Sequence, residues 1–299
     1  MGRLVQCVPN FSEGIKKDVV ESIVNEIRNV ENVTLLDYSS DESHNRSVVT
    51  FVGEPQAVKK AAFNAAKMAA ELINMEKHQG EHPRMGATDV IPFIPISEVT
   101  MEDCIQLANE LGKDMYEQLG IPVYLYEAAA KKQERKNLAK VRKGQYEGLK
   151  EEVSKPEKHP DFGEPQLHQT AGITAVGARP PLIAYNINLD TSNVEIAKEI
   201  AKTIRGSSGG FQDVKALGIL IEERHIAQVT INMCNYKKVP LYRVFEIVKV
   251  EASRYGVNIL GSEIVGLTPM EALINAAQFY LRLDNFQIGQ ILEKRLLEE

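Results

Sequence analysis

Two histidines four residues apart, His78 and His82, have the type and spacing that proton or metal chemistry requires. They lie in residues 76–95, a segment rich in glycine and proline, which is typical of a loop. Three more ionisable residues stand in the same segment: Glu81, Arg84 and Asp89. Ionisable side chains on a loop between regular elements are typical of a functional site. Because histidine titrates near neutral pH, we interpret His82 as a general acid or base.

Metal binding is a second interpretation, because these residues spell the His-x-x-Glu-His pattern of some zinc enzymes. Zinc would need both histidines on one face of a helix. Gly80 costs about 1 kcal/mol inside a helix, and Pro83 pushes the preceding His82 out of the helical region. We therefore expect no metal at this segment. A third interpretation, surface histidines without a chemical role, stays open.

The composition limits the class of protein. The chain has 299 residues, of which 43% are hydrophobic, and a formal net charge of −6. This acidic balance disfavours a nucleic-acid partner. No apolar run reaches the ~18 residues of a membrane span, and the first residues give no indication of a signal peptide. The three cysteines are too far apart for a disulfide framework, so we expect a cytoplasmic protein without a membrane partner.

Hydrophobic periodicity predicts the element order β-α-β-β-α-β twice. The first set has strands at residues 4–8, 33–38, 46–52 and 90–96, a helix that Ser12 would cap, and a helix that begins at Pro55. The second set has strands at residues 182–189, 214–222, 226–233 and 257–265, and helices at 193–204 and 240–255, with two more helices after Thr268. We therefore expect an α+β protein with two α/β subdomains, residues 1–179 and 180–299. Each would have a ferredoxin-like core, with a ligand cleft between them.

The segment between these two sets is predicted to extend the first subdomain. We expect a helix up to Leu119 that begins with a capping box of Thr100 and Asp103. A strand over 121–126, a helix over 128–153 that Gly144 can break, and a loop over 154–181 follow. Residues 131–143 contain seven basic residues and one glutamate. They form either a solvated helix face or a positive rim that steers an anionic ligand.

Polar residues also stand at the ends of predicted strands. Asp37 ends one strand, and Asn45 and Arg46 begin the next. Such side chains either face a site or cap a turn, and the sequence leaves both interpretations open.

Five longer motifs reveal a resemblance to a known family. They occupy residues 7–14 (Cys-Val-Pro-Asn-Phe-Ser-Glu-Gly), 80–90 (Gly-Glu-His-Pro-Arg-Met-Gly-Ala-Thr-Asp-Val), 177–179 (Gly-Ala-Arg), 182–189 (Leu-Ile-Ala-Tyr-Asn-Ile-Asn-Leu) and 262–269 (Ser-Glu-Ile-Val-Gly-Leu-Thr-Pro). Together they resemble the glutamate formimidoyltransferase family, which also forms the amino-terminal half of the bifunctional formimidoyltransferase-cyclodeaminase. The motifs extend over essentially the whole chain and leave no room for a cyclodeaminase half. The resemblance therefore implies a monofunctional transferase that assembles as a homodimer.

The resemblance also implies a reaction, namely transfer of a formimino group from N-formimino-L-glutamate to N5 of tetrahydrofolate, late in histidine degradation. The products are 5-formiminotetrahydrofolate and L-glutamate; tetrahydrofolate is a co-substrate and no metal is required. The family's catalytic histidine lies in Gly-Glu-His-Pro-Arg and corresponds to His82. Its folate-binding segment corresponds to ten residues: Gly163, Glu164, Pro165, Gln166, Leu167, His168, Gln169, Thr170, Ala171 and Gly172.

The residue types fit this chemistry. N5 attacks the amidine carbon, and a tetrahedral intermediate then expels the amino group of glutamate; one histidine can accept the first proton and return it to the leaving nitrogen. A carboxylate such as Asp37 would orient the cationic formimino group, and Arg84 would bind a substrate carboxylate through a bidentate pair. Asp89 is a third candidate for substrate binding. We expect His82 to titrate near neutral pH in the profile of kcat/KM.

Two other functions stay open on the sequence alone. One is a related folate one-carbon transferase that uses formiminoglycine or a formyl donor. The other is a folate-binding protein without catalytic activity. The sequence does not distinguish between these donors.

Overall fold

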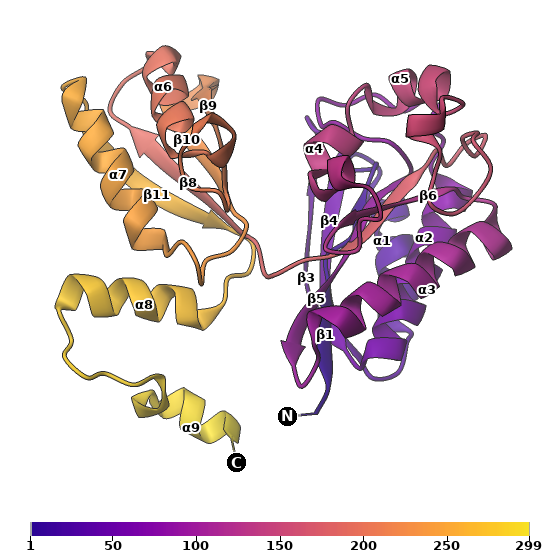
Figure 1. Cartoon of the computed structure of the whole chain (residues 1–299), viewed down its shortest axis with the longest axis horizontal. Coiled ribbons are helices and arrows are strands. Elements are labelled where there is room, and N and C mark those ends of the chain that lie inside the picture. Colours follow the sequence, from indigo (N-terminus) through magenta and orange to yellow (C-terminus); the bar gives the residue numbers. More distant parts are fainter. Residues whose placement is uncertain (1, 299) are drawn as a thin grey trace. The chain divides into compact units, whose positions relative to one another are not determined.

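The structure, a computed structural model, describes residues 2–298 and divides into two compact units, Met1–Arg179 and Pro180–Glu299. Each unit has its own β-sheet with helices packed on it (Figure 1). The fold is therefore mixed α and β with two sheets. Within the described residues, no helix combines the length and the apolar character that crossing a membrane would require.

The first unit contains a seven-stranded sheet. Its strands are β1 (Leu4–Cys7), β2 (Asn10–Phe11), β3 (Val33–Asp41), β4 (Arg46–Gly53), β5 (Thr88–Ser97), β6 (Val123–Glu127) and β7 (Thr174–Ala178). The strand β1 pairs with both β4 and β5, and β3 pairs with β4, so these four strands lie in the order β5-β1-β4-β3. The short β2 continues β1 between the same two neighbours after Pro9, which has no N–H for the ladder.

Three helices cover one face of this sheet: α1 (Lys17–Arg28), α2 (Pro55–Leu72) and α3 (Met101–Leu119) (Figure 1). Their buried side chains recur at helical spacing and pack on alternate residues of the strands, such as Val49 and Phe51. The capping box that the sequence predicts for α3 is present. The Thr100 side chain accepts from the Asp103 backbone N–H, and the Asp103 carboxylate accepts from the Thr100 backbone N–H.

Residues 128–153 do not form one continuous helix, and one break falls at Gly144, where the sequence allows it. The chain instead forms a short 3-10 helix η1 (Gln133–Lys136) and the helices α4 (Leu138–Val141) and α5 (Gln145–Glu152), and a second 3-10 turn η2 (Pro156–Lys158) follows. The break falls at Gly144, whose φ of 90° is left-handed, and at Gln145, whose φ is 55°. The helices α4 and α5 pack through Val141 and Leu149 on the face of the sheet opposite α1–α3.

A second difference concerns residues 154–181, which the sequence predicts to be a loop. They contain the strand β7, which pairs in parallel with β5 and with β6 and so extends the sheet beyond the predicted core. Glycine and alanine make up three of its five residues, so the strand has few of the β-branched residues, and none of the aromatic ones, that usually mark a strand in a sequence.

The second unit has a four-stranded antiparallel sheet in the order β11-β8-β10-β9. Its elements are β8 (Ile183–Leu189), α6 (Val194–Ile204), η3 (Gly206–Ser208), β9 (Val214–Ile221), η4 (Glu222–Arg224), β10 (Ile226–Met233), α7 (Leu241–Arg254), β11 (Ile259–Val265), α8 (Met270–Leu281), η5 (Ile288–Gln290) and α9 (Leu292–Glu298). The core under α6 and α7 uses alternate strand residues such as Ile187 and Val229. On β8 and β10 the intervening residues include polar side chains, among which Gln228 donates to both Asn188 and Glu263.

A buried ion pair fixes residues 130–162 against the edge strand β6. Arg135 Nη1 donates to Asp161 Oδ2 at 2.6 Å, and both side chains are 5% exposed. The same carboxylate oxygen accepts from the backbone N–H of Leu125 at 2.8 Å. The Arg135 guanidinium lies 4.4 Å from the centre of the Tyr124 ring. The pair therefore joins η1, β6 and the segment that precedes β7.

We expect Arg135→Met to lower the free energy of unfolding of the first unit by about 3–5 kcal/mol, because it leaves the Asp161 carboxylate buried without its cation. Urea unfolding followed by fluorescence and circular dichroism measures this change. The matched control is Lys198→Met, which breaks the exposed ion pair with Glu195 on α6 and should change stability by less than about 0.5 kcal/mol. Equal effects of the two substitutions would contradict this role of the buried pair.

Candidate functional site

The His82 loop, defined as residues 78–87, leads directly into β5 and packs on the turn between β3 and β4. The Asn45 side chain donates to the Gln79 carbonyl at 2.7 Å, and the Glu81 N–H donates to the Ser43 carbonyl at 3.3 Å. A Cβ atom on Gly80 would lie 2.5 Å from the carbonyl oxygen of His44. Only glycine permits this close approach of the two backbones.

The segment from Asn10 to Gly14 holds both the His82 loop and that turn. The Ser12 backbone N–H and hydroxyl donate to the carbonyls of Ala87 and Gly86, at 2.9 and 2.7 Å. The Gly14 N–H donates to the Asn45 side chain at 2.9 Å. The prediction that Ser12 caps the first helix is therefore wrong. A Glu13 carboxylate oxygen instead accepts from the backbone N–H groups just before α1.

His78 is fixed through both ring nitrogens. Its Nε2 lies 3.0 Å from the Asn45 carbonyl oxygen, so Nε2 carries the proton, and its Nδ1 accepts from Arg84 Nε at 3.2 Å. Burial lowers the pKa of His78, and the nearby Arg84 adds to this effect. His78 is therefore a neutral bridge that orients Arg84 and the turn.

Arg84 uses all of its donors within the chain. Its guanidinium forms a bidentate pair with Glu147, at 2.9 and 2.6 Å, and also donates to Gln145. The remaining bonds go to the Nδ1 and carbonyl oxygen of His78. Arg84 is 7% exposed. The binding of a substrate carboxylate that the sequence predicts for Arg84 would therefore require Glu147 to leave.

His82 lies beside a second arginine, Arg46, for which the sequence leaves open both a role in a site and a role in capping a turn. Arg46 Nη1 is 3.2 Å from His82 Nε2 and 3.1 Å from the Asn10 side-chain oxygen. Because a guanidinium can only donate, Nε2 of His82 is the acceptor and has the lone pair that a general base needs. The His44 ring lies edge-on to His82, with 6.3 Å between ring centres.

The charge around His82 is strongly positive. Burial lowers the pKa of His82 from 6.5 to about 3, and Arg46, Arg142 and two further cationic neighbours contribute to this shift. The pKa near 7 that the sequence analysis expects therefore differs from the value in the unliganded protein. The physical reason is that the charged imidazolium would be both desolvated and surrounded by like charge.

Asp89 and Arg142 form a buried ion pair close to His82. Asp89, in β5, is 1% exposed, and one of its oxygens accepts from the Met85 N–H at 2.9 Å. Its other oxygen accepts from Arg142 Nη2. Burial raises the pKa of Asp89, whereas the Arg142 guanidinium opposes that change. With both oxygens used inside the protein, Asp89 positions Arg142.

Asp37 is not brought together with these residues. It is exposed in β3 and lies opposite Thr50, four residues along β4 from Arg46. Four strand residues correspond to about 13 Å. Asp37 is therefore about one strand's length from the loop that carries His82.

The predicted folate segment, residues 163–172, is joined to the His82 loop through the backbone. The Ala87 N–H donates to the Ala171 carbonyl at 2.9 Å, and the Ile173 N–H donates to the Met85 carbonyl at 3.2 Å. Gly172 has a φ of 72°, and a Cβ atom there would lie 2.4 Å from the carbonyl oxygen of Met85. Backbone hydrogen bonds thus join the His82 loop to the predicted folate segment.

A cavity of about 320 Å³ lies beside this segment. Its lining comes from the end of α3, the start of β6 and the predicted folate segment: Tyr116, Gly120, Pro122, Glu164, Gln166, Leu167, His168 and Gln169. His168 accepts through Nδ1 from the N–H groups of Thr170 and Ala171, which fixes the turn beside the cavity. The segment therefore offers polar side chains around a pre-formed hollow.

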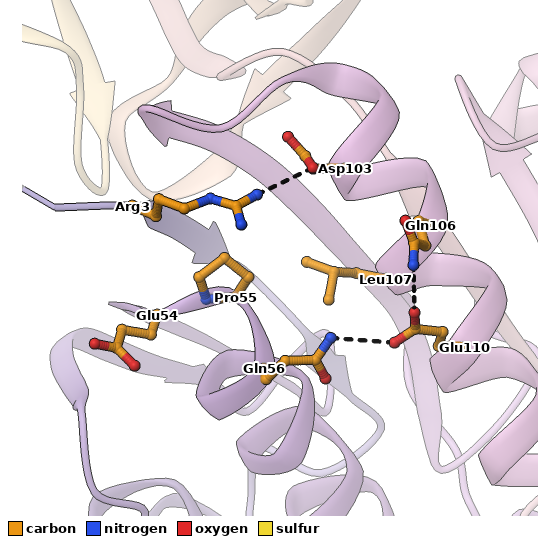
Figure 2. Close-up of a pocket in the computed structure, with 8 residues that line it drawn as sticks. All are labelled: Arg3, Glu54, Pro55, Gln56, Asp103, Gln106, Leu107 and Glu110. Carbon is orange, nitrogen blue, oxygen red and sulfur yellow. Dashed lines mark hydrogen bonds and ion pairs between the residues drawn. The ribbon is translucent and has the colours of Figure 1, made fainter.

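A larger cavity, of about 440 Å³, lies at the amino-terminal ends of α2 and α3 (Figure 2). The polar side chains around it bind one another, since Arg3 pairs with Asp103, and Glu110 accepts from Gln56 and Gln106. None of its lining residues belongs to the His82 loop or to the predicted folate segment. Size alone therefore does not identify the functional cavity.

The site is suited to moving a proton next to an anion. It combines a neutral imidazole with two arginines, Arg46 and Arg142. Among residues 2–298, no group of three histidine, cysteine, aspartate or glutamate side chains is arranged to hold a metal ion. Both arginines have a recognisable position in the sequence. Arg46 begins a strand, and Arg142 belongs to the basic stretch 131–143.

Comparison with known proteins gives consistent matches over both units. The family model described as "Formiminotransferase domain, N-terminal subdomain" matches residues 4–179, and the one described as "Formiminotransferase domain" matches residues 184–298. The chain is 53% identical to glutamate formimidoyltransferase of Streptococcus pyogenes serotype M1, over 99% of this chain and 100% of that protein. It is 50% identical to the protein of the same name from Thermoplasma acidophilum, over 98% and 97%. It is 44% identical to formimidoyltransferase-cyclodeaminase of Gallus gallus, over 96% of this chain and 54% of that protein.

We expect His82 to stay neutral between pH 8 and pH 5 in the unliganded protein, because its pKa is lowered from 6.5 to about 3. As the pH falls, His82 binds its proton in the unfolded chain before it does so in the folded protein. The free energy of unfolding therefore keeps the full contribution of the neutral imidazole above about pH 6.5 and loses it progressively as the pH falls toward 3. Nitrogen-15 NMR of the ring measures the titration, and urea unfolding at pH 7 and pH 4.5 measures the stability. His82→Gln, which does not titrate, should show a smaller loss at pH 4.5. A His82 titration midpoint near 6.5 would contradict the geometry.

Proposed function

Because the chain belongs to the formiminotransferase family, we propose that it transfers the formimino group from N-formimino-L-glutamate to N5 of tetrahydrofolate. The products are 5-formiminotetrahydrofolate and L-glutamate, a step of histidine degradation. The strongest support comes from two proteins named glutamate formimidoyltransferase. This chain is identical to each of them at about half of all residues, over nearly the full length of this chain and of each relative. The chain is accordingly an enzyme, and tetrahydrofolate is its co-substrate.

His82 is the proposed proton carrier. Its Nε2 has a lone pair, and its neutral state allows it to accept the proton that N5 loses on attacking the amidine carbon. The resulting imidazolium then donates this proton to the leaving nitrogen of glutamate. Both transfers need only one ring, because N5 and the leaving nitrogen are bonded to the same tetrahedral carbon. Holding both substrates in one geometry provides a further part of the acceleration.

The proposed folate site is the segment Gly163–Gly172 with its cavity. Its backbone bonds to Met85 and Ala87 support this assignment, because they hold the folate segment next to the loop that carries the proton carrier. The left-handed φ of Gly163 and Gly172 keeps the backbone open at both ends of the segment. We also propose that both units are variants of one split β-α-β core, since their four-strand orders correspond.

Assay with tetrahydrofolate and each candidate donor tests the reaction. We expect a change in the folate ultraviolet spectrum, and release of L-glutamate, with N-formimino-L-glutamate. Formiminoglycine and formyl donors serve as the matched comparison. Faster transfer from either of them would reassign the donor, and binding of folate without transfer from any donor would indicate a non-catalytic protein.

We expect His82→Ala to lower kcat by about 10²–10⁴-fold, which is the usual contribution of a general acid–base group. Tetrahydrofolate binding, measured by calorimetry, should be largely retained, because the imidazole acts on protons in transit. His78→Ala should lower kcat much less, since His78 acts through Arg84. The matched control is His225→Ala, at an exposed histidine of the second unit. A folded His82→Ala protein with a nearly unchanged kcat would refute this role.

A further inference from the structure

We propose that Arg46 and Arg142 form a binding site, next to His82, for the α-carboxylate of the N-formimino amino acid donor. The inference rests on the proposed transfer reaction and assigns residues that family membership alone does not identify. Arg46 and Arg142 would thus replace Arg84 as the residues that bind the substrate carboxylate. The five N–H groups of Arg84 all have partners inside the chain.

The covalent structure of the donor determines where its α-carboxylate lies. The leaving nitrogen is bonded to Cα, which bears the carboxylate, so the carboxylate oxygens are about 3–4 Å from that nitrogen by standard bond lengths. When His82 protonates this nitrogen, the two nitrogens approach to about 3 Å. The carboxylate must then lie within a few ångströms of the His82 ring. Arg46 Nη1 is already 3.2 Å from His82 Nε2.

Both arginines have an unused donor. The Nε atoms of Arg46 and Arg142 are buried and have no hydrogen-bond partner among the described residues. A buried donor without a partner is costly, and in a native structure it usually marks a place for a ligand or an ordered water. A carboxylate can accept from Nε and Nη of one guanidinium at once, which is the geometry that these donors require.

Arg46 also has a charge that the protein leaves uncompensated. Arg142 pairs with Asp89, and Arg84 pairs with Glu147. The two hydrogen-bond partners of Arg46, Asn10 and His82, are both neutral, and no carboxylate of the described residues lies within ion-pair distance of it. Burial lowers the pKa of Arg46 and the nearby Arg142 adds to this shift, whereas the more distant carboxylates of Asp41 and Asp89 oppose it. An anionic ligand would supply the missing charge.

Carboxylate binding would also prepare His82 for proton transfer. In the unliganded protein the N–H of Arg46 occupies the lone pair of His82 Nε2. A carboxylate that accepts this N–H would release Nε2 to the reacting nitrogens. It would also offset the positive charge of the guanidinium groups near His82, of which Arg46 is the one without a carboxylate partner among the described residues.

The proposal concerns the α-carboxylate and not the side-chain carboxylate of glutamate. The side-chain carboxylate is three carbons further along a flexible chain, so the position of the leaving nitrogen does not fix its place. The site would consequently accept any N-formimino α-amino acid, and the length of the side chain would be recognised elsewhere.

Calorimetry with two stable donor analogues tests the site without relying on turnover. N-acetyl-L-glutamate has both carboxylates, whereas its α-amide, N-acetyl-L-isoglutamine, has only the side-chain carboxylate. The variants are Arg46→Met and Arg142→Lys; the latter retains the ion pair with the buried Asp89 and so protects the fold. Arg3→Met, at the opposite end of the sheet, is the matched control, because it removes an arginine from an exposed pair with Asp103.

We expect Arg46→Met to weaken N-acetyl-L-glutamate binding about 10- to 100-fold, as loss of a charge-assisted hydrogen bond does. Arg142→Lys should weaken it less, and Arg3→Met should not weaken it. The parent protein should bind the α-amide more weakly than it binds N-acetyl-L-glutamate. The Arg46→Met protein should bind the α-amide about as tightly as it binds N-acetyl-L-glutamate. In turnover, Arg46→Met should raise the KM for N-formimino-L-glutamate and leave the KM for tetrahydrofolate near the parental value.

Two results would overturn the inference. One is a folded Arg46→Met protein that binds N-acetyl-L-glutamate as tightly as the parent does. The other is a parent protein that binds both analogues equally. If binding depends on Arg46 and on the α-carboxylate, but the parent forms no 5-formiminotetrahydrofolate, the carboxylate site stands and the transfer reaction is wrong.

Discussion

The parallel pairing of β5 with β7 is the constraint on which the candidate site depends. Val90 to Phe93 pair with Ala175 to Ala178. Parallel neighbours begin at the same edge of a sheet, so the segments that precede them emerge together. One of these segments is the His82 loop and the other is the predicted folate segment, and backbone hydrogen bonds from Ala87 and Ile173 join them. Without this pairing, residues about 85 positions apart would have no reason to meet.

The arginines near His82 show that the partner of a side chain decides its role. Arg84 forms an ion pair with Glu147 and donates two hydrogen bonds to His78, and it thereby stabilises the His82 loop. Arg142 is held by the buried Asp89. Arg46 has neutral partners only and approaches the imidazole itself. The residue type is the same in all three cases, but only the third leaves a positive charge available to a ligand.

The two sheets have the same arrangement of apolar and helix-covered faces. Helices cover one face of each, and period-two alternation along the strands supplies the apolar side chains. The opposite face of the second sheet has a connected polar network. Gln228 donates to Asn188 and Glu263, and Thr230 donates to Asn186. These bonds connect the polar side chains of β8, β10 and β11, whereas Leu217 and Ile219 of β9 are exposed on the same face.

The sequence by itself determined the elements that local patterns encode. The β-α-β-β-α-β orders follow from hydrophobic periodicity, the capping box at Thr100 follows from a three-residue spacing, and the family follows from long motifs such as residues 80–90. The glycine at position 144 also marked the break that the structure has there, whereas the strand β7 was missed, because its alanine and glycine residues have a weak strand propensity. The position of each element's ends was thus less well determined than its existence.

Only the tertiary structure decided which polar side chains share a site. Serine is a common helix-capping residue, but Ser12 donates hydrogen bonds to the carbonyls of Gly86 and Ala87, which are distant in sequence. Arg84 has the charge for a substrate carboxylate but is taken by Glu147. Asp37 lies about 13 Å along the strands from the start of β4. The physical reason is that hydrogen-bond and ion-pair partners are chosen by distance in space, which sheet topology sets and which sequence spacing does not reveal.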